Sequence, residues 1–212
     1  MTSHVLLVHG LYTGVWIMRS LGRKLEQQGF KVHYFGYRTT RQPLVQHAAV
    51  LADEVMRLYG QNIENLHFVG HSLGGLLLRH LAAARPDLVR GGIVTVGTPH
   101  QGSSVAHRIY RSAYLSRLLG ETYHHGLDGN IPALPQSIAL GSLAGNHAAG
   151  LGKVIGIKGE NDGTVGVEET YCEGMQDHIV LPVTHTGMLF STEVVAQVAA
   201  FLRNGHFIRS KS

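Results

Sequence analysis

Several features that define other classes of protein are scarce in this chain of 212 residues. It has a single cysteine, Cys172, so it cannot form an internal disulfide, and nothing in it requires an oxidising compartment. No stretch approaches the ~20 apolar residues that a membrane-spanning helix needs. The first residues also lack the basic flank of a secretory signal. We therefore expect a cytoplasmic protein without a transmembrane segment.

Charge is also low, because charged residues make up 15% of the chain and hydrophobic residues 44%. A disordered chain would be richer in charge and poorer in apolar groups. The length favours one domain over residues 1–212. Lys and Arg are scattered, with a net charge of +4 and no run that alternates with aromatic residues. We therefore expect no nucleic-acid partner.

Histidine, in contrast, is abundant, with 15 residues that include His100, His107 and the adjacent pair His124 and His125. Neither an HExxH motif nor a Cys–His spacing typical of a metal site occurs. We therefore predict no bound metal and interpret these histidines as solvated or hydrogen-bonded side chains.

The first hundred residues alternate between short β-rich apolar runs and helical patterns, which is typical of βαβ units and a parallel sheet. The predicted strands are 4–8, 31–35, 66–69 and 92–96, and the predicted helices are 14–28, 43–59 and 73–84. Further along, 178–182 is predicted as the last strand and 192–204 as the closing helix. The patterns at 138–144 and 153–157 each indicate a strand, and either could be the penultimate strand of the sheet.

After Pro99 this alternation is lost until about residue 138, which exceeds the ~2–6 residues usual between a strand and a helix. We therefore predict an inserted cap or lid over residues 100–150. Within it, 105–119 is predicted as one amphipathic helix and 120–136 as a loop. The apolar face of this helix comprises Ile109, Tyr110, Ala113, Tyr114 and Leu118, opposite Arg108, Arg111 and Arg117. The helix could cover the active-site edge of the sheet, with its arginines toward solvent or an anionic membrane surface, or it could pack on the outer face of the sheet.

The sequence Gly70-His71-Ser72-Leu73-Gly74-Gly75 follows a predicted strand and opens a predicted helix. This context is that of a nucleophile elbow, in which a serine at a sharp turn projects its hydroxyl toward substrate. A side chain at position 70 or 74 would collide with neighbouring elements. We predict that Ser72 is the nucleophile, although an ordinary glycine-rich turn remains the alternative.

A serine hydroxyl needs a general base, and the base needs an acid that orients it, in the chain order serine, acid, histidine. His185 follows the last predicted strand and is the predicted base, with His178 and His206 as alternatives. Asp162 is the predicted acid, because it lies on a turn that precedes the last strand. Glu160 and Asp177 are its alternatives.

The oxyanion of an acyl-transfer reaction needs preorganised N–H donors. We predict these donors to be the backbone N–H groups of Leu73 and of Leu11, with Tyr12 as the second choice after Leu11. His9 is expected to hold this loop. The segment 97–102 could shape the pocket wall or form an ordinary turn. The residues predicted to bind substrate are Tyr12, His71, His100, Tyr110 and Tyr114.

Taken together, the His9-Gly10-Leu11 motif, the elbow, Gly97–Gly102, Asp162-Gly163 and His185–Ser191 resemble the lipase and esterase branch of the α/β-hydrolase superfamily over residues 4 to 204. The resemblance is strongest to small bacterial lipases. It implies a mostly parallel sheet of about six strands flanked by helices, with Ser72, Asp162 and His185 as a catalytic triad and Leu11 and Leu73 as oxyanion donors.

The function expected from these features is hydrolysis of a small-molecule or lipid ester through an acyl-enzyme, without a cofactor. A thioesterase, a lipid deacylase or an acyltransferase would use the same residues. A non-catalytic binding protein on this fold is disfavoured because all three triad residues are present.

Overall fold

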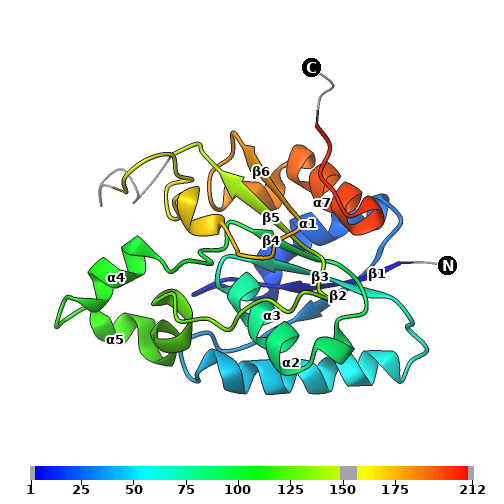
Figure 1. The fold of residues 1–212 in the computed structure, drawn as a ribbon, viewed down its shortest axis with the longest axis horizontal. Coiled ribbons are helices and arrows are strands. Elements are labelled where there is room, and N and C mark those ends of the chain that lie inside the picture. Colours follow the sequence, from blue (N-terminus) through cyan, green and yellow to red (C-terminus); the bar gives the residue numbers. More distant parts are fainter. Residues whose placement is uncertain (1–2, 149–156, 210–212) are drawn as a thin grey trace.

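A computed structural model describes residues 3–148 and 157–209 of the chain. At its centre is a six-stranded sheet in the order β2-β1-β3-β4-β5-β6, and every neighbouring pair of strands is parallel (Figure 1). The strands are β1 (His4–Val8), β2 (Lys31–Phe35), β3 (Leu66–His71), β4 (Ile93–Val96), β5 (Leu140–Gly145) and β6 (Asp177–Leu181). The predicted fold class is therefore confirmed.

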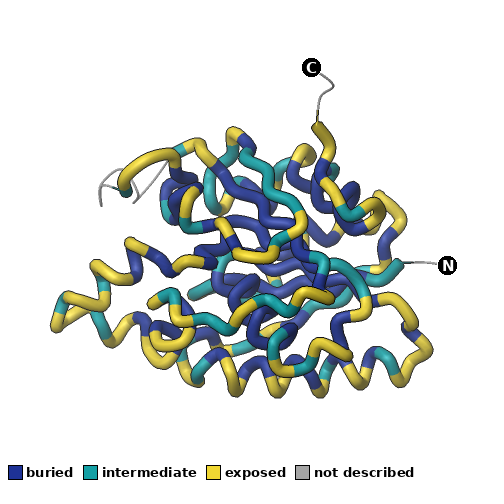
Figure 2. The backbone as a smooth tube through the Cα atoms, viewed as in Figure 1, coloured by how far each residue is buried: buried dark blue, intermediate teal, exposed yellow. Residues whose placement is uncertain are grey.

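Four helices cover the two faces of this sheet (Figure 1). They are α1 (Val15–Gln27), α2 (Leu44–Tyr59), α3 (Leu73–Ala84) and α7 (Thr192–Asn204). Helices α1 and α7 share one apolar cluster with β1 and β5, and α2 and α3 share another with the opposite face of β1 and β3. Successive strand residues point to opposite faces, so β3 sends Phe68 into one cluster and Val69 into the other. The inner strands β1, β3, β4 and β5 are accordingly almost continuously buried, as the dark blue centre of Figure 2 shows.

Helix boundaries follow local signals that the sequence carries. Gly29 adopts a positive φ of 90° two residues after α1, and Gly205 adopts the left-handed conformation at the end of α7. The Ser191 hydroxyl accepts a hydrogen bond from the Val194 N–H and so caps the start of α7. These helices lie within one or two residues of the predicted ranges.

The parallel arrangement brings the loops after β1, β3, β4 and β6 to one edge of the sheet. The chain runs from β1 outward to β2 and then back to β3 on the other side of β1, so the direction of winding reverses there. In parallel α/β sheets, ligands bind outside the carboxyl ends of the strands at such a reversal. Leu11 follows β1 and Ser72 follows β3, so these two residues flank this point.

The prediction of a single helix over 105–119 is wrong. The structure has two short helices, α4 (Ser104–Tyr110) and α5 (Ser116–Leu119), separated by turns and followed by helical turns at Gly120–Thr122 and Tyr123–Leu127 where a loop was expected. A helix is stabilised mainly by burial of its apolar face. Here the buried groups are Ala106, Leu119, Tyr123 and Leu127 rather than the predicted face, so the chain must turn between them.

The two short helices lie beyond the carboxyl ends of the strands rather than on an outer face of the sheet (Figure 1). The Tyr12 hydroxyl donates a hydrogen bond to the Leu118 carbonyl, and the Glu121 N–H donates one to the Thr40 carbonyl at 3.2 Å. Segment 104–127, called the cap segment below, is thus tied to the loops after β1 and β2.

Of the two candidates for the penultimate strand, the first is β5, shifted to Leu140–Gly145. Most of the second candidate, 153–157, lies outside the described residues. None of the helices in the described part of the chain combines the length and the apolar character needed to cross a lipid bilayer.

Candidate active site

Ser72 sits at a sharp turn between β3 and α3. Its backbone has φ 53° and ψ −122°, a left-handed conformation that costs free energy for any residue other than glycine. Two contacts hold this turn, because the Ser72 N–H donates to the Val96 carbonyl at 2.9 Å and the Thr98 hydroxyl donates to the Ser72 carbonyl at 2.9 Å. The neighbouring strand β4 and the loop after it therefore keep the strained turn in place.

Two glycines make this turn possible. A methyl group on Gly70 would lie 2.5 Å from the Gly75 nitrogen, and one on Gly74 would overlap the Val8 carbonyl oxygen. The expectation that a side chain at either position would collide with adjacent elements is confirmed.

Asp162 and His185 meet at the same edge of the sheet. The Nδ1–H of His185 donates to Asp162 Oδ2 at 2.7 Å, and the His185 N–H donates to the Asp162 carbonyl at 2.9 Å. The other carboxylate oxygen of Asp162 accepts hydrogen bonds from the Thr164 and Val165 N–H groups at 2.9 and 2.8 Å. The Asp162 side chain is 1% exposed and that of His185 is 13% exposed. A buried carboxylate that is fully hydrogen-bonded can fix the orientation of an imidazole.

The alternative acids and bases lie elsewhere. Glu160 accepts a long hydrogen bond of 3.4 Å from Asn146, and Asp177 pairs with Arg209. His178 lies within β6 against Thr170, at 2.9 Å. His206 follows α7, where its Nδ1 lies 3.4 Å from the Phe207 carbonyl. None of these four residues forms a hydrogen bond or an ion pair with the side chain of His185 or Ser72.

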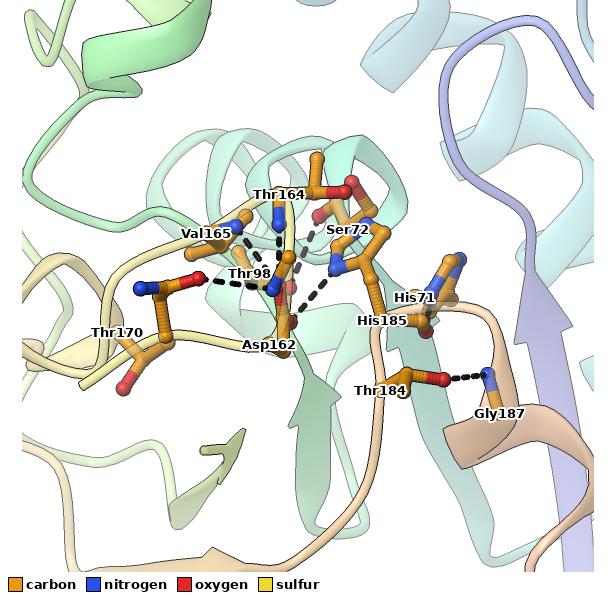
Figure 3. Close-up of polar contacts among 12 residues, drawn as sticks. His71, Ser72, Thr98, Asp162, Thr164, Val165, Thr170, Thr184, His185 and Gly187 are labelled. Atoms are coloured by element: carbon orange, nitrogen blue, oxygen red, sulfur yellow. Dashed lines mark hydrogen bonds and ion pairs between the residues drawn. The ribbon is translucent and has the colours of Figure 1, made fainter. Parts of the chain in front are cut away.

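Figure 3 shows the Ser72 side chain beside the His185 imidazole, on the side of the ring away from the Thr184 backbone. With Nδ1 protonated and bonded to Asp162, the other ring nitrogen, Nε2, carries a free electron pair. The structure thus brings the three residues predicted as nucleophile, base and acid into one cluster.

The loop after β1 is held by a buried histidine. The His9 Nδ1–H donates to the Gly10 carbonyl at 3.0 Å, its Nε2 accepts from the Tyr37 N–H at 3.3 Å, and the Tyr37 ring stacks on His9 with centroids 4.7 Å apart. Burial lowers the pKa of His9 and favours its neutral form. His9 is therefore a support for the loop, as expected. Tyr37 was not anticipated, and no motif in the sequence singles it out.

The two predicted oxyanion donors belong to the loop after β1 and to the start of α3. Leu73 is the first residue of α3, where the N–H groups of a helix have no partner within it. The N–H of Leu11 has no hydrogen-bond partner within residues 3–148 and 157–209. The N–H of Tyr12, the second choice, donates to the Thr39 hydroxyl at 3.3 Å. This engagement favours Leu11 over Tyr12.

The residues predicted to bind substrate are placed unevenly. His71 and His100 are buried, which argues against direct contact with a substrate. Tyr110 stacks on Tyr123 with ring centroids 3.8 Å apart, whereas Tyr114 is 92% exposed and is not brought to the cluster. Tyr12 is exposed within the loop after β1.

Gly97 has a role that the sequence analysis missed. It has φ 60°, and a methyl group there would lie 3.1 Å from His185 Nδ1 and 3.2 Å from Asp162 Oδ2. The backbone immediately after β4 therefore passes directly against the bond between these two side chains. A glycine after a predicted strand is the only sequence signal, and it does not distinguish this packing from an ordinary turn.

Within residues 3–148 and 157–209, no group of three or more His, Cys, Asp or Glu residues is placed so that it could hold a metal ion. Among the described residues, each buried histidine has a hydrogen-bond partner for at least one ring nitrogen. His100 Nε2 lies 2.9 Å from the Thr95 hydroxyl, for example.

The chain is similar to known hydrolases in sequence and in fold. A family model described as alpha/beta hydrolase fold matches residues 3–127. A triacylglycerol lipase of Vibrio cholerae is 28% identical over 135 residues, which are 61% of this chain and 43% of the lipase. A triacylglycerol lipase of Pseudarthrobacter phenanthrenivorans is 32% identical over 113 residues, 48% of this chain and 34% of that lipase. The matched regions thus span less than half of these two relatives.

Among solved structures, the mature form of a Bacillus licheniformis lipase superposes with a TM-score of 0.80 at 18% identity. The superposition covers 98% of this chain and 93% of the lipase. This likeness shows a shared fold over nearly the whole of both chains.

Proposed function

Because the chain belongs to the family that shares the alpha/beta hydrolase fold, we propose that it is a serine hydrolase that cleaves carboxylic esters through an acyl-enzyme. One observation carries the proposal: Ser72 sits on a strained turn beside His185, whose Nδ1–H is bonded to the buried Asp162 carboxylate at 2.7 Å. Similarity to triacylglycerol lipases supports a small-molecule or lipid ester as the substrate.

In the first half of the proposed reaction, Ser72 Oγ attacks the ester carbonyl carbon while His185 Nε2 takes the hydroxyl proton. The positive charge that His185 gains is stabilised by the Asp162 carboxylate. The carbonyl oxygen becomes an oxyanion that accepts hydrogen bonds from the Leu11 and Leu73 N–H groups. His185 then gives its proton to the leaving oxygen, the alcohol departs, and the acyl group remains on Ser72.

In the second half, water attacks the acyl carbon and His185 Nε2 accepts its proton. The oxyanion forms again between the same two donors. When it collapses, the bond to Ser72 Oγ breaks, the carboxylic acid leaves, and the proton returns from His185 to Ser72. These steps use only groups of the chain and water, so the proposal includes no cofactor.

The conformation of the turn supports this role for Ser72. A strained backbone persists only where the surrounding structure fixes it, and such strain is concentrated at functional sites. Here the surroundings are the hydrogen bonds of Ser72 with Val96 and Thr98, and the two glycines at positions 70 and 74. An ordinary turn between a strand and a helix would not require them.

The test is Ser72→Ala, assayed with a fluorophosphonate probe and with nitrophenyl esters of increasing acyl length. We expect loss of both labelling and hydrolysis with an unchanged circular dichroism spectrum, because only the Ser72 oxygen can carry the acyl group. Ser20→Ala, which changes a serine in α1, is the matched control and should label like the unaltered protein. Undiminished labelling of Ser72→Ala would overturn the proposal.

A further inference from the structure

His71 immediately precedes Ser72 and takes no part in the proposed reaction steps. It nevertheless lies against both the loop after β1 and the loop that carries His185. Its side chain is 4% exposed. On β3 it shares a face with His67 and Val69, the face that packs toward α1 and α7. The loop that carries His185 leads into α7 on this same side of the sheet.

One ring nitrogen of His71 contacts the backbone of the predicted base. His71 Nε2 lies 3.0 Å from the His185 carbonyl oxygen, and the two rings are 4.8 Å apart at their centroids with planes tilted by 46°. Since a carbonyl oxygen can only accept a hydrogen bond, Nε2 must carry the proton and donate it.

The other ring nitrogen of His71 faces the loop after β1. A methyl group on Gly10 would lie 3.1 Å from His71 Nδ1 and 3.0 Å from the Ser72 β-carbon. His71 Nδ1 is buried and has no hydrogen-bond partner among the described residues. The His71 ring is therefore enclosed between the loop after β1 and the loop after β6.

This arrangement keeps His71 neutral. A second proton on the ring would place an unpaired charge in a buried position next to His185. Burial, with the neighbouring His185 as a second cause, lowers the pKa of His71 to about 3. Because its ring is neutral, His71 does not repel the positive charge that His185 gains in the proposed reaction.

We infer that His71 is a positioning residue for the proposed hydrolysis, and that its Nε2–H bond to the His185 carbonyl ties the base to the nucleophile elbow. Asp162 holds His185 through the ring and the backbone N–H, but Asp162 belongs to a different loop from Ser72. His71 is covalently joined to Ser72, so its bond fixes the distance between nucleophile and base directly.

The inference rests on the proposed function and predicts a specific pattern among variants of position 71. In a glutamine side chain the amide nitrogen can take the place of Nε2. The asparagine side chain is too short for its amide to reach the His185 carbonyl, and leucine has no hydrogen-bond donor. We expect His71→Leu and His71→Asn to lower kcat by about 10- to 100-fold with little change in KM, because misplacement of a catalytic group by about 1 Å can cost ~10²-fold. His71→Gln should retain most of the activity.

His67 provides a matched control on the same strand and the same face. It is also buried, and its Nδ1 accepts a hydrogen bond from the Gly92 N–H at 3.0 Å, far from Ser72. His67→Leu should lower the melting temperature without lowering kcat. If His71→Leu did the same, or if His71→Gln were no more active than His71→Asn, the positioning role would be wrong.

A second measurement separates this inference from the proposed function. The downfield proton resonance of the His185 Nδ1–H, which is bonded to Asp162, reports the orientation of His185 without any substrate. We expect this resonance to persist in His71→Gln and to broaden or shift in His71→Asn and His71→Leu. An unchanged resonance in all three would overturn the inference, whereas loss of labelling in Ser72→Ala would still support the hydrolase.

Discussion

The loops at the strand ends and the cap segment differ in how their side chains are partnered. In the strand-end loops, Asp162 uses both carboxylate oxygens, and Ser72 is held through its N–H and its carbonyl. In the cap segment, Tyr114, Leu115 and Leu118 are exposed although they are apolar. Geometry at the strand ends is therefore set by many specific contacts, whereas the cap segment depends on a few buried anchors such as Leu119 and Tyr123.

The difference matters for chemistry and specificity. Groups that transfer protons must be held within a fraction of an ångström, and this requires rigid supports. A segment that only limits which substrates enter can tolerate looser packing. We therefore expect substitutions at the strand ends to affect the rate of the chemical step, and substitutions in the cap segment to affect substrate preference.

The largest expected effect comes from a substitution that disrupts the hydrogen bond between Asp162 and His185. Asp162→Asn keeps the size of the side chain but favours the wrong imidazole tautomer of His185, so kcat should fall by ~10⁴. Glu160→Gln, two residues away on the same turn, should cost far less. The measurement is kcat for a nitrophenyl ester in both variants. A reversed order of the two losses would assign the acid to Glu160.

The next effect concerns stability at low pH. Burial, helped by Arg79, lowers the pKa of His100 to about 3, as burial and His185 do for His71. Below the ordinary histidine value of about 6.5 the unfolded chain takes up these protons and the folded chain does not. The free energy of unfolding should therefore fall between about pH 6.5 and pH 3, by about 1.4 kcal/mol per pH unit for each such histidine.

Urea unfolding between pH 7 and pH 4 measures this slope. His100→Gln should make it shallower, because one buried neutral histidine is removed. Ser20→Ala, which changes no titratable group, is the control and should leave the slope unchanged. Equal slopes in the His100 variant and the unaltered protein would show that His100 is not a neutral buried group.

The smallest effects are expected in the cap segment, where two tyrosines can be compared. Tyr110→Ala removes a stack on Tyr123 and should cost about 1 kcal/mol of stability, whereas Tyr114→Ala should change it by less than about 0.5 kcal/mol. If the cap segment lines an acyl groove, burial of each acyl methylene is worth up to ~0.8 kcal/mol.

The groove can be tested with acetyl, butyryl and octanoyl esters of one alcohol. Tyr110→Ala should flatten the dependence of kcat/KM on acyl length while activity on the acetyl ester survives, and Tyr114→Ala should leave the profile intact. A profile that is unchanged in Tyr110→Ala as well would restrict Tyr110 to a structural role.

The sequence predicts the strand-end part of the molecule well because local and global signals agree there. Leu66, Phe68 and Val69 indicate a buried strand, Gly70 and Gly74 mark the elbow, and the parallel topology then brings His185 to the same edge. His185 and Asp162 are 23 positions apart, but His185 follows the last predicted strand and Asp162 lies on a turn before it, so the chain order serine, acid, histidine predicts that they meet.

The cap segment was predicted less well for a physical reason. Helical periodicity over 105–119 describes a possible apolar face, but not whether a surface exists to cover it. The structure buries Leu119 and Tyr123 instead and leaves Tyr114 in solvent. The packing of Gly97 and the donor on His71 were missed because each depends on contacts between strands and loops far apart in the sequence.

The contact of Gly97 with the Asp162–His185 bond has a consequence for protein engineering. Gly97 carries no side chain, and a side chain there would lie against the hydrogen-bonded pair of Asp162 and His185. A designer who seeks new specificity can vary exposed positions of the cap segment such as Tyr114, whereas selection for activity in a mutant library should enrich glycine at position 97.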